Sequence, residues 1–124
     1  MTFDPNAAAL PDSGFFGLPH TPDEAKVVLI PVPYEATTSY RGGTSNGPAA
    51  ILEGSKQVDL FDLDTGKPYE VGISMLDEPA QVRAWNDEAK ALAKPIIESG
   101  GVDADEAALA KINALSETMN GWVC

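Results

Sequence analysis

The chain predicts an α/β domain, because strand-like and helix-like segments alternate along its 124 residues. A short apolar, β-branched run at Val27–Ile30 has the composition of a buried strand. A long polar loop follows, and Gly47-Pro48 then begins a helix, with proline where its missing N–H costs nothing. Two later segments, 79–98 and 103–122, place apolar residues at steps of three and four. Strand, loop and helix in this order open such a domain, in which ligands bind beyond the carboxyl ends of the strands.

Composition narrows the class of protein. With 44% hydrophobic residues the chain is expected to fold, and its net charge of −11 argues against nucleic acid and against anionic membrane surfaces. No apolar run approaches the ~20 residues that a membrane helix needs, and no basic region followed by an apolar one begins the chain. We therefore expect neither a membrane span nor a signal peptide, and a cytoplasmic location.

The single cysteine, Cys124, is the last residue and cannot form an intrachain disulfide. One cysteine and one histidine cannot build a zinc site. The histidine, His20, lies in a proline-rich segment and is expected to be solvated. Cys124 is therefore interpreted as a terminal thiol without a catalytic role.

Residues 1–24 are predicted to form an extended N-terminal arm, and residues 25–124 the α/β domain. The arm is rich in proline, glycine, alanine and aspartate, with isolated apolar side chains as anchors. Two interpretations of Phe15-Phe16 remain open: the pair plugs the edge of the core, or it docks on a neighbouring subunit.

The first strand is expected at Lys26–Val32, ending near Ile30 because Pro31 removes a ladder donor. The irregular loop Pro33–Asn46 follows. An irregular loop of this length is unusual in a compact domain unless it is functional. The loop either lines a pocket at the carboxyl edge of the sheet, or is ordered by its own hydrogen bonds with Glu35 and Arg41 paired.

The middle of the chain is predicted to continue the alternation. Helix Pro48–Lys56 is expected to be followed by an edge strand or extended segment at 58–63, a turn at 64–68 and a second strand at Tyr69–Met75. The apolar residues expected to be buried by the helix are Ala50, Ile51 and Leu52.

Two helices follow the second strand. The first, 79–98, should kink or end at Pro95, which lacks the donor for the carbonyl of Ala91. The second should begin at Asp103, with Glu106 completing a capping box. The predicted apolar stripes are Val82, Trp85, Ala89, Leu92 and Ile96 on the first helix, and Ala108, Ile112, Leu115, Met119 and Trp122 on the second.

The stretch PVPYEATTSYRGGTSNGPAAILEGS carries a family resemblance. A strand ends in the triplet Pro33-Tyr34-Glu35, a Thr/Ser-Tyr-Arg-Gly loop follows, and a Gly-Pro-Ala-Ala-Ile helix start completes the pattern. This pattern resembles the first strand, loop and helix of the ureohydrolases (the arginase and agmatinase family), and is most similar to the agmatinase-like branch. The resemblance implies a three-layer αβα fold around a mainly parallel sheet.

The resemblance also implies a reaction, the hydrolysis of a guanidino group to urea and an amine. In complete members a hydroxide bridging two Mn²⁺ ions attacks the guanidinium carbon. The metal-binding segments of the family (Gly-Gly-Asp-His, Asp-Ala-His-x-Asp and a late Asp-x-Asp pair) do not occur in this sequence. The chain therefore resembles the N-terminal portion of such an enzyme, and the last apolar stripe stops as if cut in mid-element.

The resemblance places Glu35, Thr38, Tyr40 and Arg41 on the rim of a substrate pocket, with no metal ligand among them. The expected partners are a guanidino substrate, the missing C-terminal metal-binding portion or a second polypeptide that carries it, and further copies in a homo-oligomer. Two alternatives remain open: a non-catalytic structural or regulatory subunit, and an acidic binding module unrelated to hydrolysis.

Overall fold

The computed structural model describes residues 3–102 and 104–124, which form two compact units. We call them the strand unit (Met1–Pro31 and Pro48–Asp77) and the helix unit (Val32–Gly47 and Glu78–Cys124). Each unit therefore joins segments that are far apart in the sequence. Across these described ranges, no helix combines the length and the apolar character that crossing a bilayer requires.

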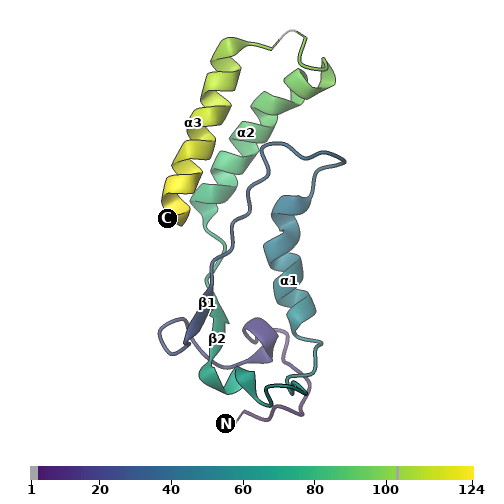
Figure 1. Cartoon of the computed structure of the whole chain (residues 1–124), viewed down its shortest axis with the longest axis vertical. Helices are drawn as coiled ribbons and strands as arrows, with labels where there is room; N and C mark the ends of the chain where they lie inside the picture. The colour runs from purple at the N-terminus through teal and green to yellow at the C-terminus, as the bar shows by residue number, and fades with distance from the viewer. Residues whose placement is uncertain (1–2, 103) are drawn as a thin grey trace. The chain divides into compact units, whose positions relative to one another are not determined.

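The strand unit contains a parallel pair of strands, β1 (Val27–Leu29) and β2 (Ile73–Met75), in which Val28 lies opposite Ser74 (Figure 1). β1 ends before Ile30, as Pro31 predicted. A parallel pair needs a long crossover connection, which here includes helix α1 (Gly47–Ser55). The predicted α/β class is therefore confirmed, with a sheet consistent with an incomplete three-layer fold.

Two segments contain less strand than the sequence predicted. The segment predicted as strand Tyr69–Met75 begins as a 3₁₀ helix, η3 (Pro68–Val71), and Gly72 then reverses the backbone with φ of 81°. Residues 58–63, predicted as an edge strand or an extended segment, form no regular strand, so the edge-strand alternative is wrong. Asp62 instead holds a turn, since its carboxylate accepts hydrogen bonds from the N–H groups of Asp64 (3.0 Å) and Thr65 (2.7 Å).

The N-terminal segment packs within the strand unit through turns and a short 3₁₀ helix, η1 (Phe15–Gly17). Phe15 and Leu18 are buried, as expected of a plug for the core. His20 is half-buried, contrary to the expected solvated position, and its buried Nδ1 has no hydrogen-bond partner among the described residues. The predicted burial of Ala50 and Ile51 on α1 was also wrong, because both residues are exposed, Ile51 at 59%.

The helix unit is built on an antiparallel pair, α2 (Ala80–Glu98) and α3 (Glu106–Val123) (Figure 1). Pro95 does not end α2, which continues to Glu98, and the carbonyl of Pro95 accepts from the N–H of Ser99 at 3.1 Å. The missing N–H of Pro95 removes only the helical donor to the carbonyl of Ala91. α3 is capped by Asp105, whose side chain accepts from the N–H of Ala107 at 3.0 Å. The predicted cap, Asp103, lies outside the described residues. Side chains buried between or beside these helices are Val82, Asn86, Ala89, Ala93 and Leu115.

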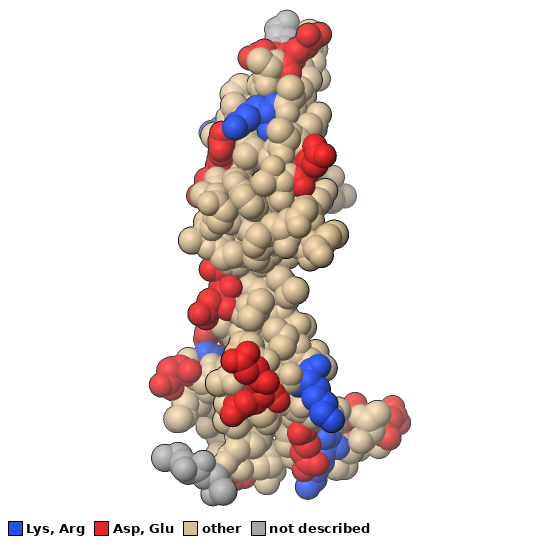
Figure 2. Space-filling model, turned by 90° about the vertical axis from the view of Figure 1, so that its left-hand side faces the viewer, with Lys and Arg blue, Asp and Glu red and all other residues tan. Residues whose placement is uncertain are grey.

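The surface reflects the acidic composition. On the face in Figure 2, basic side chains stand singly or beside acidic ones and gather into no patch. A broad uncharged area covers part of the helix unit on this face. The exposed large apolar residues of α3 are Leu109, Trp122 and Val123.

Candidate functional site

The loop that leaves β1 holds a buried carboxylate. Glu35 is only 5% exposed, although it carries a charge and lies in a segment without helix or strand. A carboxylate so placed must be paired and hydrogen-bonded, because removing it from water is otherwise strongly unfavourable. Its partners therefore define the local structure.

Three donors surround the Glu35 carboxylate. The ammonium of Lys90 lies 2.7 Å from Oε1, and the N–H of Gly43 donates to Oε1 at 2.8 Å. The N–H of Ser45 donates to Oε2. The Glu35 carboxylate thus binds Gly43 and Ser45, which lie eight and ten residues further along, and closes the chain between them into a ring. We call residues 36–42 the lobe.

Three side chains of α2 bind the base of this lobe. Arg83, Asn86 and Lys90 are three and four positions apart and so share one face of the helix. Oδ1 of Asn86, a residue only 1% exposed, accepts from the N–H of Glu35 at 2.6 Å. Arg83 donates to the hydroxyl of Ser45 at 3.0 Å and to its carbonyl at 3.1 Å, and pairs with Glu78. We call Glu35, Arg83, Asn86 and Lys90 the clamp.

The basic residues of the clamp lower the pKa of two carboxyl groups, Glu35 within the clamp and Glu78 beside it. Lys90, followed by the N–H groups of Ser45 and Gly43, lowers the pKa of Glu35 from 4.5 to about 2. Arg83 likewise lowers the pKa of Glu78. Both groups are therefore held in their charged form at neutral pH.

The lowered pKa of Glu35 predicts acid sensitivity. Because the folded state holds this proton more weakly than the unfolded chain, the contribution of Glu35 to stability is complete above pH 4.5 and is lost as the pH falls toward 2. We expect the free energy of unfolding, measured by urea denaturation, to fall across this window more steeply for the unaltered chain than for Glu35→Gln. Parallel profiles for the two chains would contradict the assignment.

The four residues predicted for a pocket rim differ in their placement. Glu35 is the centre of the clamp and pairs with Lys90, so the Glu35–Arg41 pair of one of the two open interpretations is wrong. Thr38 is half-buried, whereas Tyr40 and Arg41 are exposed on the lobe. Their role toward a substrate stays a prediction.

Sequence reasoning missed Arg83, Asn86 and Lys90. A signal was present, because Asn86 falls beside the apolar stripe of α2, where a buried amide needs a partner. Charged residues three positions before it and four after it continue the same face. The loop partner itself, 55 positions from Lys90, has no local sequence signal.

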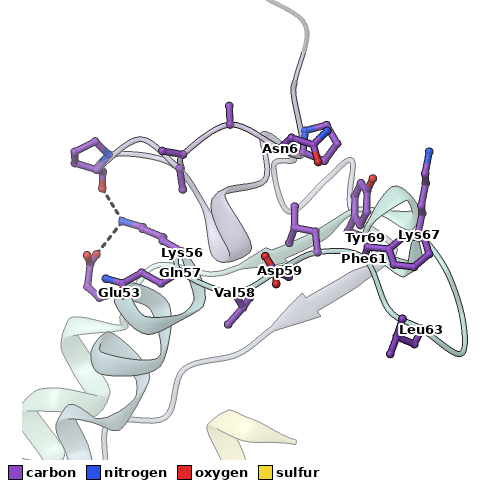
Figure 3. A pocket seen from close by; sticks show the side chains of 16 residues that line it. Asn6, Glu53, Lys56, Gln57, Val58, Asp59, Phe61, Leu63, Lys67 and Tyr69 are labelled. Carbon is purple, nitrogen blue, oxygen red and sulfur yellow. Dashed lines mark hydrogen bonds and ion pairs between the residues drawn. The ribbon is translucent and has the colours of Figure 1, made fainter.

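The strand unit contains a separate open pocket of about 1300 Å³ (Figure 3). Lys56 lies at one side of it, but its ammonium is already engaged by the carbonyl of Pro11 (2.6 Å) and by Glu53 (2.9 Å). The rest of the lining combines exposed apolar side chains, such as Phe61 and Leu63, with the polar side chains of Asn6, Gln57, Asp59 and Lys67. Among the described residues, this pocket brings together no group of three or more His, Cys, Asp or Glu side chains.

The described residues do not fit a metal centre. A di-metal site needs several carboxylates and imidazoles converging on one point. Over residues 3–102 and 104–124, no three His, Cys, Asp or Glu side chains converge in this way. Glu35, the most deeply placed carboxylate of the helix unit, uses its oxygens for Lys90 and two N–H groups.

Comparison with known proteins places this geometry in context. The family model described as "Arginase family" matches residues 25–110. An N(1)-aminopropylagmatine ureohydrolase from Synechocystis sp. is 50% identical over 52 residues, 40% of this chain and 17% of that protein. An enzyme of the same name from Thermus thermophilus is 39% identical over 79 residues, 62% of this chain and 27% of that protein. No solved structure matches the chain significantly. The chain thus spans about a quarter or less of the length of these relatives.

Proposed function

Because this chain belongs to the arginase family, we propose that it forms the N-terminal strand, loop and helices of a ureohydrolase that converts a guanidino compound to urea and an amine. The observation that supports this most is the family match across residues 25–110, which includes the clamp and the lobe. The activity belongs to the whole protein, of which this chain is proposed to supply the part that carries the lobe.

We propose a cationic guanidino amine as the substrate. The matched relatives are named for N(1)-aminopropylagmatine, which supports agmatine or its aminopropyl derivative. A net charge of −11 favours the approach of a cation. Thr38 and Tyr40 offer hydroxyl groups to such a substrate, whereas the guanidinium of Arg41 has donors only and gives a cation no acceptor.

The metal chemistry is proposed to lie outside this chain. Membership of the arginase family suggests a dinuclear metal centre in complete enzymes, and we propose that the metal is Mn²⁺. Its ligands would come from a further portion of the polypeptide or from a second polypeptide. The residues of this chain then act by holding the lobe in place. We propose a cytoplasmic location and a homo-oligomer as the assembled form, in which the exposed apolar residues on α3 contact another copy or the further portion of the polypeptide.

Urea release tests the proposed function. The intact natural polypeptide that contains this sequence, loaded with Mn²⁺, is expected to release urea from agmatine or N(1)-aminopropylagmatine. The 124-residue chain alone, under the same conditions, is expected to release no more than its His20→Ala variant. The proposal is wrong if the intact polypeptide cleaves no guanidino compound. Urea formed equally by a co-purifying polypeptide without this chain would assign the chain a non-catalytic role.

A further inference from the structure

We infer that Arg83, Asn86 and Lys90 are positioning residues: together with Glu35 they hold the base of the lobe so that its exposed residues form a fixed rim for the substrate. The substrate part of this inference rests on the proposed function. The clamp itself rests on contacts within the helix unit alone.

The first argument is the chemistry of the Glu35 site. A carboxylate has two oxygens with about four acceptor positions, so one group can receive an ammonium and two backbone N–H groups together. Charge-assisted hydrogen bonds of this kind are about twice as strong as neutral ones. An amide or hydroxyl at position 35 could not replace all three contacts, so closure of the ring requires an acid there.

The two glycines of the lobe base support the same conclusion. A Cβ atom at Gly42 would lie 3.1 Å from Oε1 of Glu35 and 3.1 Å from Nζ of Lys90. Gly43, which donates to the carboxylate, has φ of 121°, a conformation that side chains disfavour. One glycine therefore leaves room for the ion pair, and the next one aims its N–H at Glu35.

The second argument is the placement of the polar residues of α2. Asn86 is buried on the face that also holds Val82 and Ala89, a position where an apolar residue would ordinarily pack better. Its amide oxygen is used by the backbone of the loop, and Arg83 binds the other end of the loop at Ser45. One rigid helix thus sets the position of both ends of the lobe.

At the tip of the lobe, Tyr40 and Arg41 make no side-chain hydrogen bond or ion pair with any other residue that the structure describes. Tyr40 is fully exposed, at 101% of its reference area, and Arg41 is exposed as well. The position of the backbone that carries these side chains therefore depends on the base. A change in the base should alter substrate binding without touching substrate or metal.

Amide hydrogen exchange on the 124-residue chain tests the clamp. Lys90→Met is expected to speed exchange of the Gly43 and Ser45 N–H groups about tenfold, because it removes a charge-assisted partner of their acceptor. Lys94→Met on the same helix, where the ammonium is 3.9 Å from Glu98 and mostly exposed, is the matched control and should leave both rates unchanged. Lys90→Arg should restore most of the protection. Equal rates in Lys90→Met and Lys94→Met, or unprotected N–H groups in the unaltered chain, would overturn the inference.

Kinetics of the intact polypeptide separate positioning from general stability. Lys90→Met is expected to raise KM about tenfold, with kcat within about twofold and bound Mn²⁺ unchanged. A lower kcat at unchanged KM would instead mean that Lys90 only maintains the amount of folded enzyme, which overturns the positioning role. If the intact polypeptide releases no urea, the proposed function fails, while the exchange rates still decide whether the clamp exists.

Discussion

Glu35→Leu is expected to open the lobe and to speed tryptic cleavage after Arg41 by at least about tenfold. The substitution leaves Lys90 and the buried N–H of Ser45 without their acceptor. We estimate a loss of about 2–3 kcal/mol in closing the lobe, discounting the ion pair because the Lys90 side chain is 41% exposed. Since each 1.4 kcal/mol is roughly tenfold in an equilibrium, the open population should rise by more than an order of magnitude.

Limited proteolysis followed by mass spectrometry measures this effect, as the appearance of fragments 1–41 and 42–124. Glu98→Leu is a matched control in the same unit, because Glu98 is exposed and contacts only Lys94 at 3.9 Å among the ion pairs of the described residues. The Glu98 variant should be cut after Arg41 at the rate of the unaltered chain. Equal cleavage rates for the two leucine variants would show that Glu35 does not close the lobe.

Gly72→Ala is expected to destabilise the strand unit by about 3 kcal/mol. Gly72 has φ of 81°, and an added Cβ would lie 3.1 Å from the backbone Cα of Ala25 and 3.2 Å from the ring of His20. Backbone strain and overpacking each contribute about 1–3 kcal/mol. The Gly72 carbonyl also accepts from the N–H groups of Lys26 and Val27, so a shifted backbone weakens the start of β1.

Urea denaturation followed by circular dichroism checks the expected loss at Gly72. Gly54→Ala is the matched control, because Gly54 lies in α1 and an added Cβ there meets nothing within 4 Å. That variant should be neutral or more stable by up to about 1 kcal/mol, since alanine favours a helix over glycine. Destabilisation of similar size at both positions would mean that the close approach at Gly72 does not contribute to the loss in free energy of unfolding.

Periodicity predicted the larger elements of the fold, because their signals are local. Apolar residues at intervals of three and four predict α2 and α3, and a β-branched run predicts β1. Each of these signals lies within a few neighbouring residues. The second strand was predicted too long because its apolar composition conceals the reversal at Gly72. An isolated glycine inside a strand-like run is itself a signal of such a break.

The candidate site was less predictable, because its central contact joins distant segments. The loop pattern identified Glu35 as a residue of interest, but the one partner that it offered, in one of two open interpretations, was Arg41 in the same loop, and that pairing is wrong. Lys90 lies 55 positions away, and only the fold of the helix unit brings it to 2.7 Å. The placement of Thr38, Tyr40 and Arg41 agrees with a lobe, and their contacts with a substrate stay a prediction.

Closure of the lobe by a single carboxylate has an evolutionary consequence. The residues at the tip can be exchanged, or their number increased, while Glu35 continues to join the two ends of the ring. Doubling the length of a flexible loop adds only about 0.6 kcal/mol of closure entropy. Substitutions and insertions at the tip of the lobe can therefore change substrate preference at little cost to folding. Selection for a stable fold acts instead on Glu35 and on one face of α2.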